Sequence, residues 1–266
     1  MIALSLALLL VQQGSLERRI AAAPEGVVRF SYAARPGVYG NGRSIISWDC
    51  KDGSGRCRSQ QIDGNHSDVD SGDWASACDS GPVRIALTTR GGAVTEVRAY
   101  VGGEWRTGAS GTDLGTVGAR EASSYLLSLA ANSGTGSRAA EKAIFPAMLA
   151  DSVAPTIWRD LLRIARDANV ARKVRRSAVF WLGQAAGDAA TRGLTDLVDD
   201  GGADRDVREQ AVFALSQRPR EEGVPALIRI AKENGDPEIR RKAIFWLGQS
   251  EDPRALALFE ELLTRP

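Results

Sequence analysis

The single histidine of the chain, His66, is the first candidate for catalysis. Ser67 and Asp68 follow it directly, so a nucleophile, a base and an acid stand together in the sequence. Adjacency along the chain does not give the geometry of a hydrolytic triad, and no Gly-x-Ser-x-Gly elbow accompanies these residues. The favoured interpretation is a solvated loop histidine, and we assign no catalytic residue.

Metal ligands are the second candidate chemistry. The segment around His66 also holds Asp63, Asp70 and Asp73, but it lacks the register of a calcium-binding EF-hand loop. The three cysteines are Cys50, Cys57 and Cys78. The spacing of the first two differs from that of a zinc knuckle, so the sequence favours a disulfide, with one thiol left over and the pairing open. We predict no metal site and no cofactor.

The charge balance limits the possible classes of partner, and the N-terminal residues indicate the compartment. The 266 residues include 34 basic and 33 acidic side chains, a balance that does not favour nucleic acid or a membrane surface. The apolar run Met1–Val11 is typical of a signal peptide, assigned to residues 1–14, although no Lys or Arg precedes it. A buried N-terminal helix is the alternative. We expect a periplasmic or secreted protein with no stable membrane span after cleavage.

The first half of the chain predicts a small β-rich domain, residues 15–108. It opens with a short helix over Ser15–Ala23, followed by strands at 27–32 and 44–48. Two further strands, 82–89 and 93–101, flank Gly91-Gly92, which suits a tight hairpin turn. Residues 109–117 are rich in Gly and Thr and are predicted to be a linker.

One phrase recurs in the second half of the chain. Val174-Arg-Arg-Ser-Ala-Val-Phe-Trp-Leu-Gly-Gln184 returns at 207–217 and at 239–249, after steps of 33 and 32 residues, with a fainter copy at 139–147. A repeat of this length predicts helical hairpins stacked in an α-solenoid, assigned to residues 118–266. The fold class is therefore α+β multidomain.

Within the phrase, apolar residues fall on more than one side of the helix. Ala178, Trp181 and Leu182 share a face, whereas Val179 and Phe180 point elsewhere, so neighbouring repeats are expected to cover them. Trp181 and the equivalent Trp246 are assigned to packing. A second helix follows each copy, at 156–169, 189–200, 222–234 and 253–264.

Asp236-Pro-Glu-Ile-Arg-Arg-Lys-Ala-Ile-Phe-Trp-Leu-Gly248 resembles the HEAT repeat in its short bacterial, PBS-lyase-like form, and the whole chain looks like exported HEAT-repeat proteins of bacteria. The resemblance implies a scaffold that binds another protein of unknown identity. It also implies that the second helices line the concave surface. The residues proposed for partner contact on these helices are Arg163, Arg166, Asp196, Arg229 and Lys232.

Two enzyme families share this type of repeat. The di-iron hydroxylases place His-Glu pairs on the repeated helices, and the repeats here contain no histidine, which excludes that chemistry on ligand grounds. A bilin-lyase-like activity stays as an alternative, together with a structural or assembly-chaperone role. We expect a protein that is not an enzyme.

Overall fold

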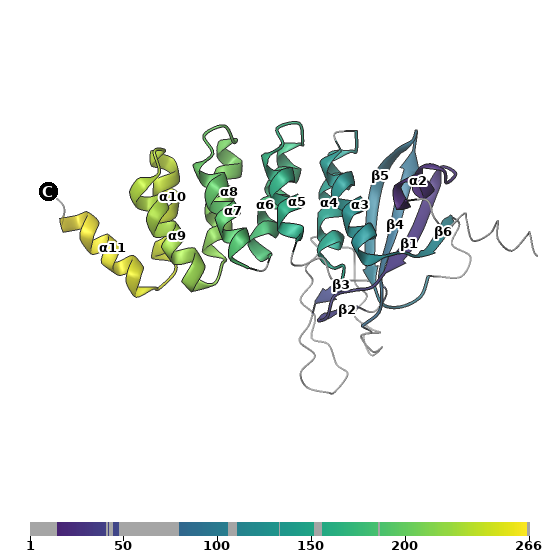
Figure 1. Cartoon of the computed structure of the whole chain (residues 1–266), viewed down its shortest axis with the longest axis horizontal. Coiled ribbons are helices and arrows are strands. Elements are labelled where there is room, and N and C mark those ends of the chain that lie inside the picture. The colour runs from purple at the N-terminus through teal and green to yellow at the C-terminus, as the bar shows by residue number, and fades with distance from the viewer. Residues whose placement is uncertain are drawn as a thin grey trace, which may run out of the picture. The chain divides into compact units, whose positions relative to one another are not determined.

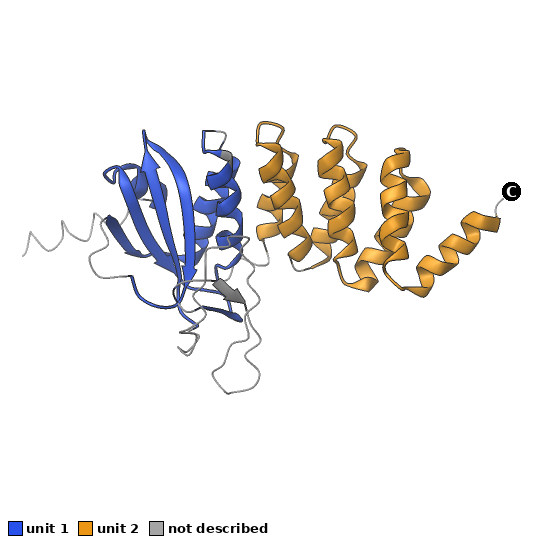
Figure 2. Cartoon of the chain, turned by 180° about the vertical axis from the view of Figure 1, so that it is seen from behind, with its two compact units in different colours: residues 1–153 blue, residues 154–266 orange. Residues whose placement is uncertain are grey.

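The computed structural model describes residues 15–40, 42, 45–47, 80–105, 111–132, 134–151, 156–185 and 187–264. The described residues form a small β-sheet region followed by a run of helices, which confirms the α+β fold class (Figure 1). The chain divides into two compact units, Met1–Val153 and Ala154–Pro266 (Figure 2).

The first unit is built on a four-stranded sheet with the order β5-β4-β1-β6. Strands β1 (Gly26–Tyr32), β4 (Val83–Arg90) and β5 (Ala93–Val101) pair antiparallel, and the pairing of β4 with β5 confirms the predicted hairpin. Gly91 and Gly92 both have positive φ, 56° and 72°, which is the backbone that a two-residue hairpin turn requires. A separate two-stranded sheet joins β2 (Val38–Gly40) to β3 (Ile45–Ser47).

Helices of the first unit cover its core side chains. The unit contains α2 (Leu16–Ala21), α3 (Ala119–Ala131) and α4 (Ser137–Met148), and α2 confirms the expected short N-terminal helix. Phe30 is fully buried and meets the ring of Tyr125 on α3 edge to face. Tyr32, also fully buried, donates a hydrogen bond from its hydroxyl to the Pro146 carbonyl at 2.6 Å. This bond ties β1 to the end of α4.

The linker predicted at 109–117 is wrong in part. Thr112–Thr116 forms β6, which pairs parallel with β1 at the edge of the sheet. The segment is polar and includes Gly115, so its own side chains do not indicate a strand. The free edge of β1 supplies the backbone partners. The domain boundary also moves, because α3 and α4, predicted to open the solenoid at residue 118, lie within the first compact unit.

The second unit consists of helices in two layers. One layer holds the motif helices, which carry the recurring phrase: α6 (Arg172–Gln184), α8 (Arg205–Ser216) and α10 (Pro237–Gly248). The second-layer helices are α5 (Ile157–Arg166), α7 (Asp188–Asp199), α9 (Arg220–Glu233) and α11 (Pro253–Thr264). Each of them confirms a second helix expected from the sequence (Figure 1).

Small residues allow the motif helices to approach closely. Ala178, Ala211 and Ala243 occupy equivalent positions and are fully buried. Gly183 on α6 faces Ala214 on α8 so closely that an added Cβ would lie 2.9 Å from the Ala214 Cβ. Contacts between repeats therefore leave no room for larger side chains at these positions.

The arginine of the recurring phrase and an aspartate that lies three residues before the next copy connect successive motif helices. Arg175 on α6 donates to Asp204, which precedes α8, and Arg208 on α8 contacts Asp236 at 3.1 Å. Asp236 also caps α10, where its carboxylate accepts a hydrogen bond from the Glu238 backbone N–H. These contacts explain why the phrase has an arginine one residue after its first apolar position.

Candidate functional site

The sequence places its catalytic and metal candidates in one segment of the first unit. His66, the neighbouring aspartates and all three cysteines lie outside the described residues, as does the 1–14 signal segment. Within the described part of the chain, no three His, Cys, Asp or Glu side chains group together as metal ligands would. Among those same residues, no helix is long and apolar enough to cross a membrane.

The five residues predicted for partner contact lie on three second-layer helices. Arg163 and Arg166 are exposed on α5, Asp196 is exposed on α7, and Arg229 and Lys232 are on α9. Arg163 contacts Asp160 of its own helix at 3.5 Å. The residues thus share one layer, as predicted, but they do not converge on one point.

Two of these five side chains connect neighbouring repeats. Arg229 donates to Asp199 on α7 at 2.7 Å, and Lys232 donates to Glu261 on α11 at 2.6 Å. Their charges are therefore matched within the unit. Arg166 and Asp196 differ, because no described residue forms an ion pair with either of them. This layer presents a balanced polar surface.

The motif helices present a different surface, which the sequence interpretation missed. Val179 and Val212 are buried, as expected, but the next residue is exposed in the first and third copies and half-exposed, as Phe213, in the second. Phe180 is 39% exposed and Phe245 is 55% exposed, so the expectation that neighbouring repeats cover this position is wrong. One residue turns a helix by about 100°, which carries the phenylalanine from the interior to the surface.

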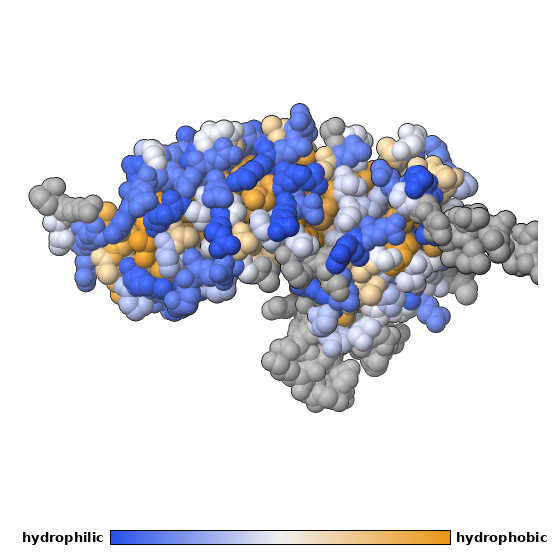
Figure 3. Space-filling model, viewed as in Figure 1, coloured by the Kyte–Doolittle hydropathy of each residue, from blue (hydrophilic) through white to orange (hydrophobic). Residues whose placement is uncertain are grey.

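Each of these phenylalanines precedes an exposed glutamine by four residues, so the two side chains share a helix face. We call this surface the aromatic–glutamine face, made of Phe180, Phe213, Phe245, Gln184, Gln217 and Gln249. The signal was present in the sequence as Phe-x-x-x-Gln in all three clear copies. Figure 3 shows apolar patches between hydrophilic side chains on one side of the helical unit.

The two tryptophans of the motif helices border this face. Trp181 meets Phe180 edge to face at 5.1 Å between ring centroids, and Trp246 lies 5.0 Å from both Phe213 and Phe245. Both indoles are half-buried rather than enclosed. The packing role predicted for Trp246 is confirmed by its contact with α8, although one part of its ring stays accessible.

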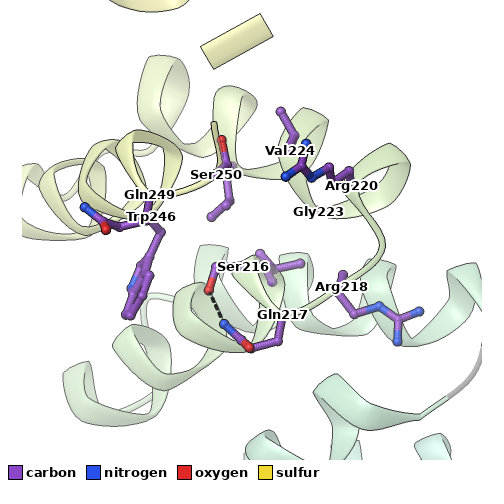
Figure 4. Close-up of a pocket in the computed structure, with 11 residues that line it drawn as sticks. Ser216, Gln217, Arg218, Arg220, Gly223, Val224, Trp246, Gln249 and Ser250 are labelled. Atoms are coloured by element: carbon purple, nitrogen blue, oxygen red, sulfur yellow. Dashed lines mark hydrogen bonds between the residues drawn. The ribbon is translucent and has the colours of Figure 1, made fainter. Parts of the chain in front are cut away.

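A cavity of about 240 Å³ adjoins the face at the end of α8 and α10. Trp246 and Gln249 line one side, and Ser216 and Gln217 line the other (Figure 4). The Gln217 amide donates to the Ser216 hydroxyl at 3.1 Å. The cavity thus combines an aromatic wall with amide groups and the Arg220 side chain, and it is large enough for a side chain of a partner.

Arg218 adjoins the cavity but points away from it (Figure 4). Its guanidinium is buried and donates to the carbonyls of Gly183 and Gly187 at 3.1 Å and to that of Ala185. It also donates to Glu222 at 2.8 Å. Hydrogen bonds from Thr191 and Arg218 lower the pKa of Glu222. Arg218 is therefore a structural residue that connects two repeats.

Comparison with known proteins gives the family of this unit. Residues 192–266 match the family model of HEAT repeats, which generally mediate protein–protein interaction. No curated protein matches the chain. The matched range covers α8 to α11 and most of α7, where the Asp-to-Arg contacts and the buried alanines recur. Residues 192–266 of the C-terminal helical unit are therefore HEAT repeats.

Proposed function

We propose that this chain is a non-catalytic scaffold that binds another protein through the aromatic–glutamine face of its HEAT repeats. The exposure of Phe180 and Phe245 carries the proposal. These rings lie outside the fully buried core of the helices, which other positions in each copy supply. Exposed aromatic side chains that recur on one face are typical of protein interfaces.

The second-layer surface is the weaker candidate. Arg229 and Lys232 already have carboxylate partners on neighbouring helices, so a binding partner would have to displace those contacts. Exposed ion pairs contribute little free energy, and surface charges mainly affect the rate of association. Arg163 and Arg166 suit a supporting role in steering a partner toward the unit.

Capture of partners from an extract of the native source tests the proposal. The full chain is immobilised, and bound proteins are identified by mass spectrometry. A Phe180→Ser/Phe245→Ser variant should lose at least about tenfold in captured partner, because burying each ring contributes about 1.5–3 kcal/mol. A variant with the exposed Arg163 and Arg166 reversed in charge, which leaves the Arg229–Asp199 contact intact, is the comparison for the other surface.

The outcome separates the two faces. Loss with the phenylalanine variant alone supports the aromatic–glutamine face, whereas loss with the arginine variant alone overturns that assignment. Far-ultraviolet circular dichroism of every variant checks that the helices are retained. Unchanged capture by both variants would overturn both faces as the binding surface, and capture of no protein by the full chain would overturn the scaffold proposal itself.

We also propose that the scaffold works in the cell envelope. The support comes from the sequence: the apolar run at Met1–Val11 and cysteines in a Gly- and Asp-rich segment. Sequencing the N-terminus of the protein recovered from the periplasm or medium tests this location. Recovery only from the cytoplasm, with Met1 retained, would overturn it.

A further inference from the structure

The aromatic–glutamine face is organised in rows that cross the motif helices. Phe180, Phe213 and Phe245 form one row, one from each helix. The glutamines form a parallel row one helical turn away, at a Cβ separation of about 5–6 Å. The aromatic row is therefore a strip bordered by Trp181 and Trp246, with a line of amide groups one helical turn away.

The spacing along the aromatic row restricts the conformation of a bound segment. Packed helices lie about 8–10 Å apart, and α6 and α8 are close enough for Gly183 and Ala214 to touch. A β-strand repeats its side chains on one face every 6.7 Å or so, which does not match the spacing between the helices. A polyproline II helix repeats every three residues, or about 9.3 Å, which does match.

An α-helix also fits the spacing between the motif helices, because its side chains return to the same face every 10.5 Å or so. The glutamine row favours polyproline II over an α-helix. An α-helix satisfies its own backbone carbonyls and has no need of amide donors. A polyproline II segment has no internal hydrogen bonds, so its carbonyls seek donors from the surface that binds it. Gln184, Gln217 and Gln249 are exposed and carry such donors.

Charge on the other side of the aromatic row is complementary to an acidic segment. The exposed or half-exposed side chains in the N-terminal half of the motif helices include seven cations and three carboxylates among the described residues, not counting Arg208 or the two aspartates that contact Arg175 and Arg208. The cations are Arg172, Lys173, Arg176, Arg205, Arg240, Arg241 and Lys242. The carboxylates Asp206, Glu209 and Glu238 form ion pairs with three of these cations, so positive charge is in excess along this edge. Helix N-termini add positive potential at the same edge.

Resting on the proposed function, we propose that the aromatic–glutamine face binds a proline-rich segment in the polyproline II conformation, with acidic residues beside it. One apolar residue in every three contacts the phenylalanine row, at one contact per repeat. The glutamine amides donate to carbonyls of the segment. Three motif helices then accommodate about seven residues.

Selection from a random twelve-residue phage library against the immobilised full chain tests this inference. Phage that also bind the Phe180→Ser/Phe245→Ser variant are removed. The expected product is a set of peptides rich in proline, with an apolar residue at every third position and Asp or Glu nearby. Enrichment of peptides with an alternating or an α-helical pattern of apolar residues would overturn the proposal. Failure to enrich any peptide would also overturn it.

Fluorescence anisotropy of one selected peptide, labelled with fluorescein, measures the contribution of each row. The Phe180→Ser/Phe245→Ser variant should weaken binding by about tenfold or more. Gln217→Ala should weaken it by about three- to tenfold, the effect of one lost hydrogen bond. A matched control, Leu256→Ser/Leu263→Ser, removes two exposed leucines of α11, which lies outside this face, and should leave binding within about twofold.

The result also separates this inference from the proposed function. Phenylalanine-dependent capture of a native partner, without any enriched proline-rich peptide, would overturn the polyproline II segment and leave the scaffold intact. Equal loss in the leucine control would overturn the assignment of the face.

Discussion

The contact between α6 and α8 at Gly183 allows the packing of the repeats to be tested by one methyl group. In Gly183→Ala, the new Cβ would lie 2.9 Å from the Ala214 Cβ and 3.3 Å from its Cα. Both atoms belong to a helix and cannot rotate away. The equivalent residue two copies later, Gly248, has nothing within 4 Å of the same added atom. Gly248→Ala is therefore a matched control.

The two substitutions should change the free energy of unfolding in opposite directions. Alanine stabilises a helix relative to glycine by up to about 1 kcal/mol, and this gain applies at both positions. At Gly183, overpacking costs about 1–3 kcal/mol, because the helices must separate. The difference between the two variants isolates this cost, since the propensity gain cancels.

Urea unfolding of the full chain, followed by tryptophan fluorescence, measures the difference. With a typical slope of about 2 kcal/mol per molar urea, the midpoints of the two variants should differ by about 0.5–1.5 M. A double variant, Gly183→Ala/Ala214→Gly, removes the opposing Cβ and should recover part of the loss. Equal midpoints for Gly183→Ala and Gly248→Ala would refute close packing between α6 and α8.

Three other substitutions test other contacts. Arg218→Met removes a buried guanidinium from Glu222 and three carbonyls and should cost about 3–5 kcal/mol in urea unfolding, whereas the exposed Arg220→Met should stay within about 0.5 kcal/mol. Similar midpoints for these two variants would contradict the structural role of Arg218. Tyr32→Phe removes a buried hydrogen bond, although the Pro146 carbonyl still accepts from the Leu149 N–H, and should cost about 1 kcal/mol, seen as a lower Tm; an unchanged Tm argues against this bond. Hydrogen bonds from Arg254 lower the pKa of Asp252 to about 2. Because this pKa lies below that of the unfolded chain, about 3.9, Asp252 stabilises the fold above pH 4, and the contribution is lost as pH falls toward 2. Asp252→Asn should therefore be less stable at pH 7, with a urea-midpoint difference that closes near pH 2; a constant difference would count against it.

The repeats were predictable because their signal is periodic and local. The buried alanines recur with the phrase, and the second helices follow it at regular intervals, so both layers could be located from the sequence. The β4–β5 hairpin was predictable for a similar reason, since Gly91 and Gly92 fall between two alternating runs. Strand β6 was not, because its pairing depends on the free edge of β1 rather than on its own residues.

The candidate site was harder to predict, since exposure depends on contacts between repeats. Periodicity places Phe180 away from the Ala178 face, but it does not say whether another helix covers that side. The structure shows that Val179 is buried and that the next residue, Phe180, is exposed. The ion pairs of Arg229 and Lys232 could not be predicted either, because their carboxylate partners lie about 30 residues away in the sequence.

This difference decides how the two surfaces of the unit should be interpreted. Arg229 contacts Asp199 on one neighbouring helix, and Lys232 contacts Glu261 on another. Both side chains therefore take part in the packing of neighbouring repeats. Reversing the charge of Arg229 therefore perturbs packing together with any binding. The exposed phenylalanines contact Trp181 and Trp246 at the surface, and other residues form the fully buried core of the helices. Binding lost with those rings, while the helices remain, reports on the interface alone.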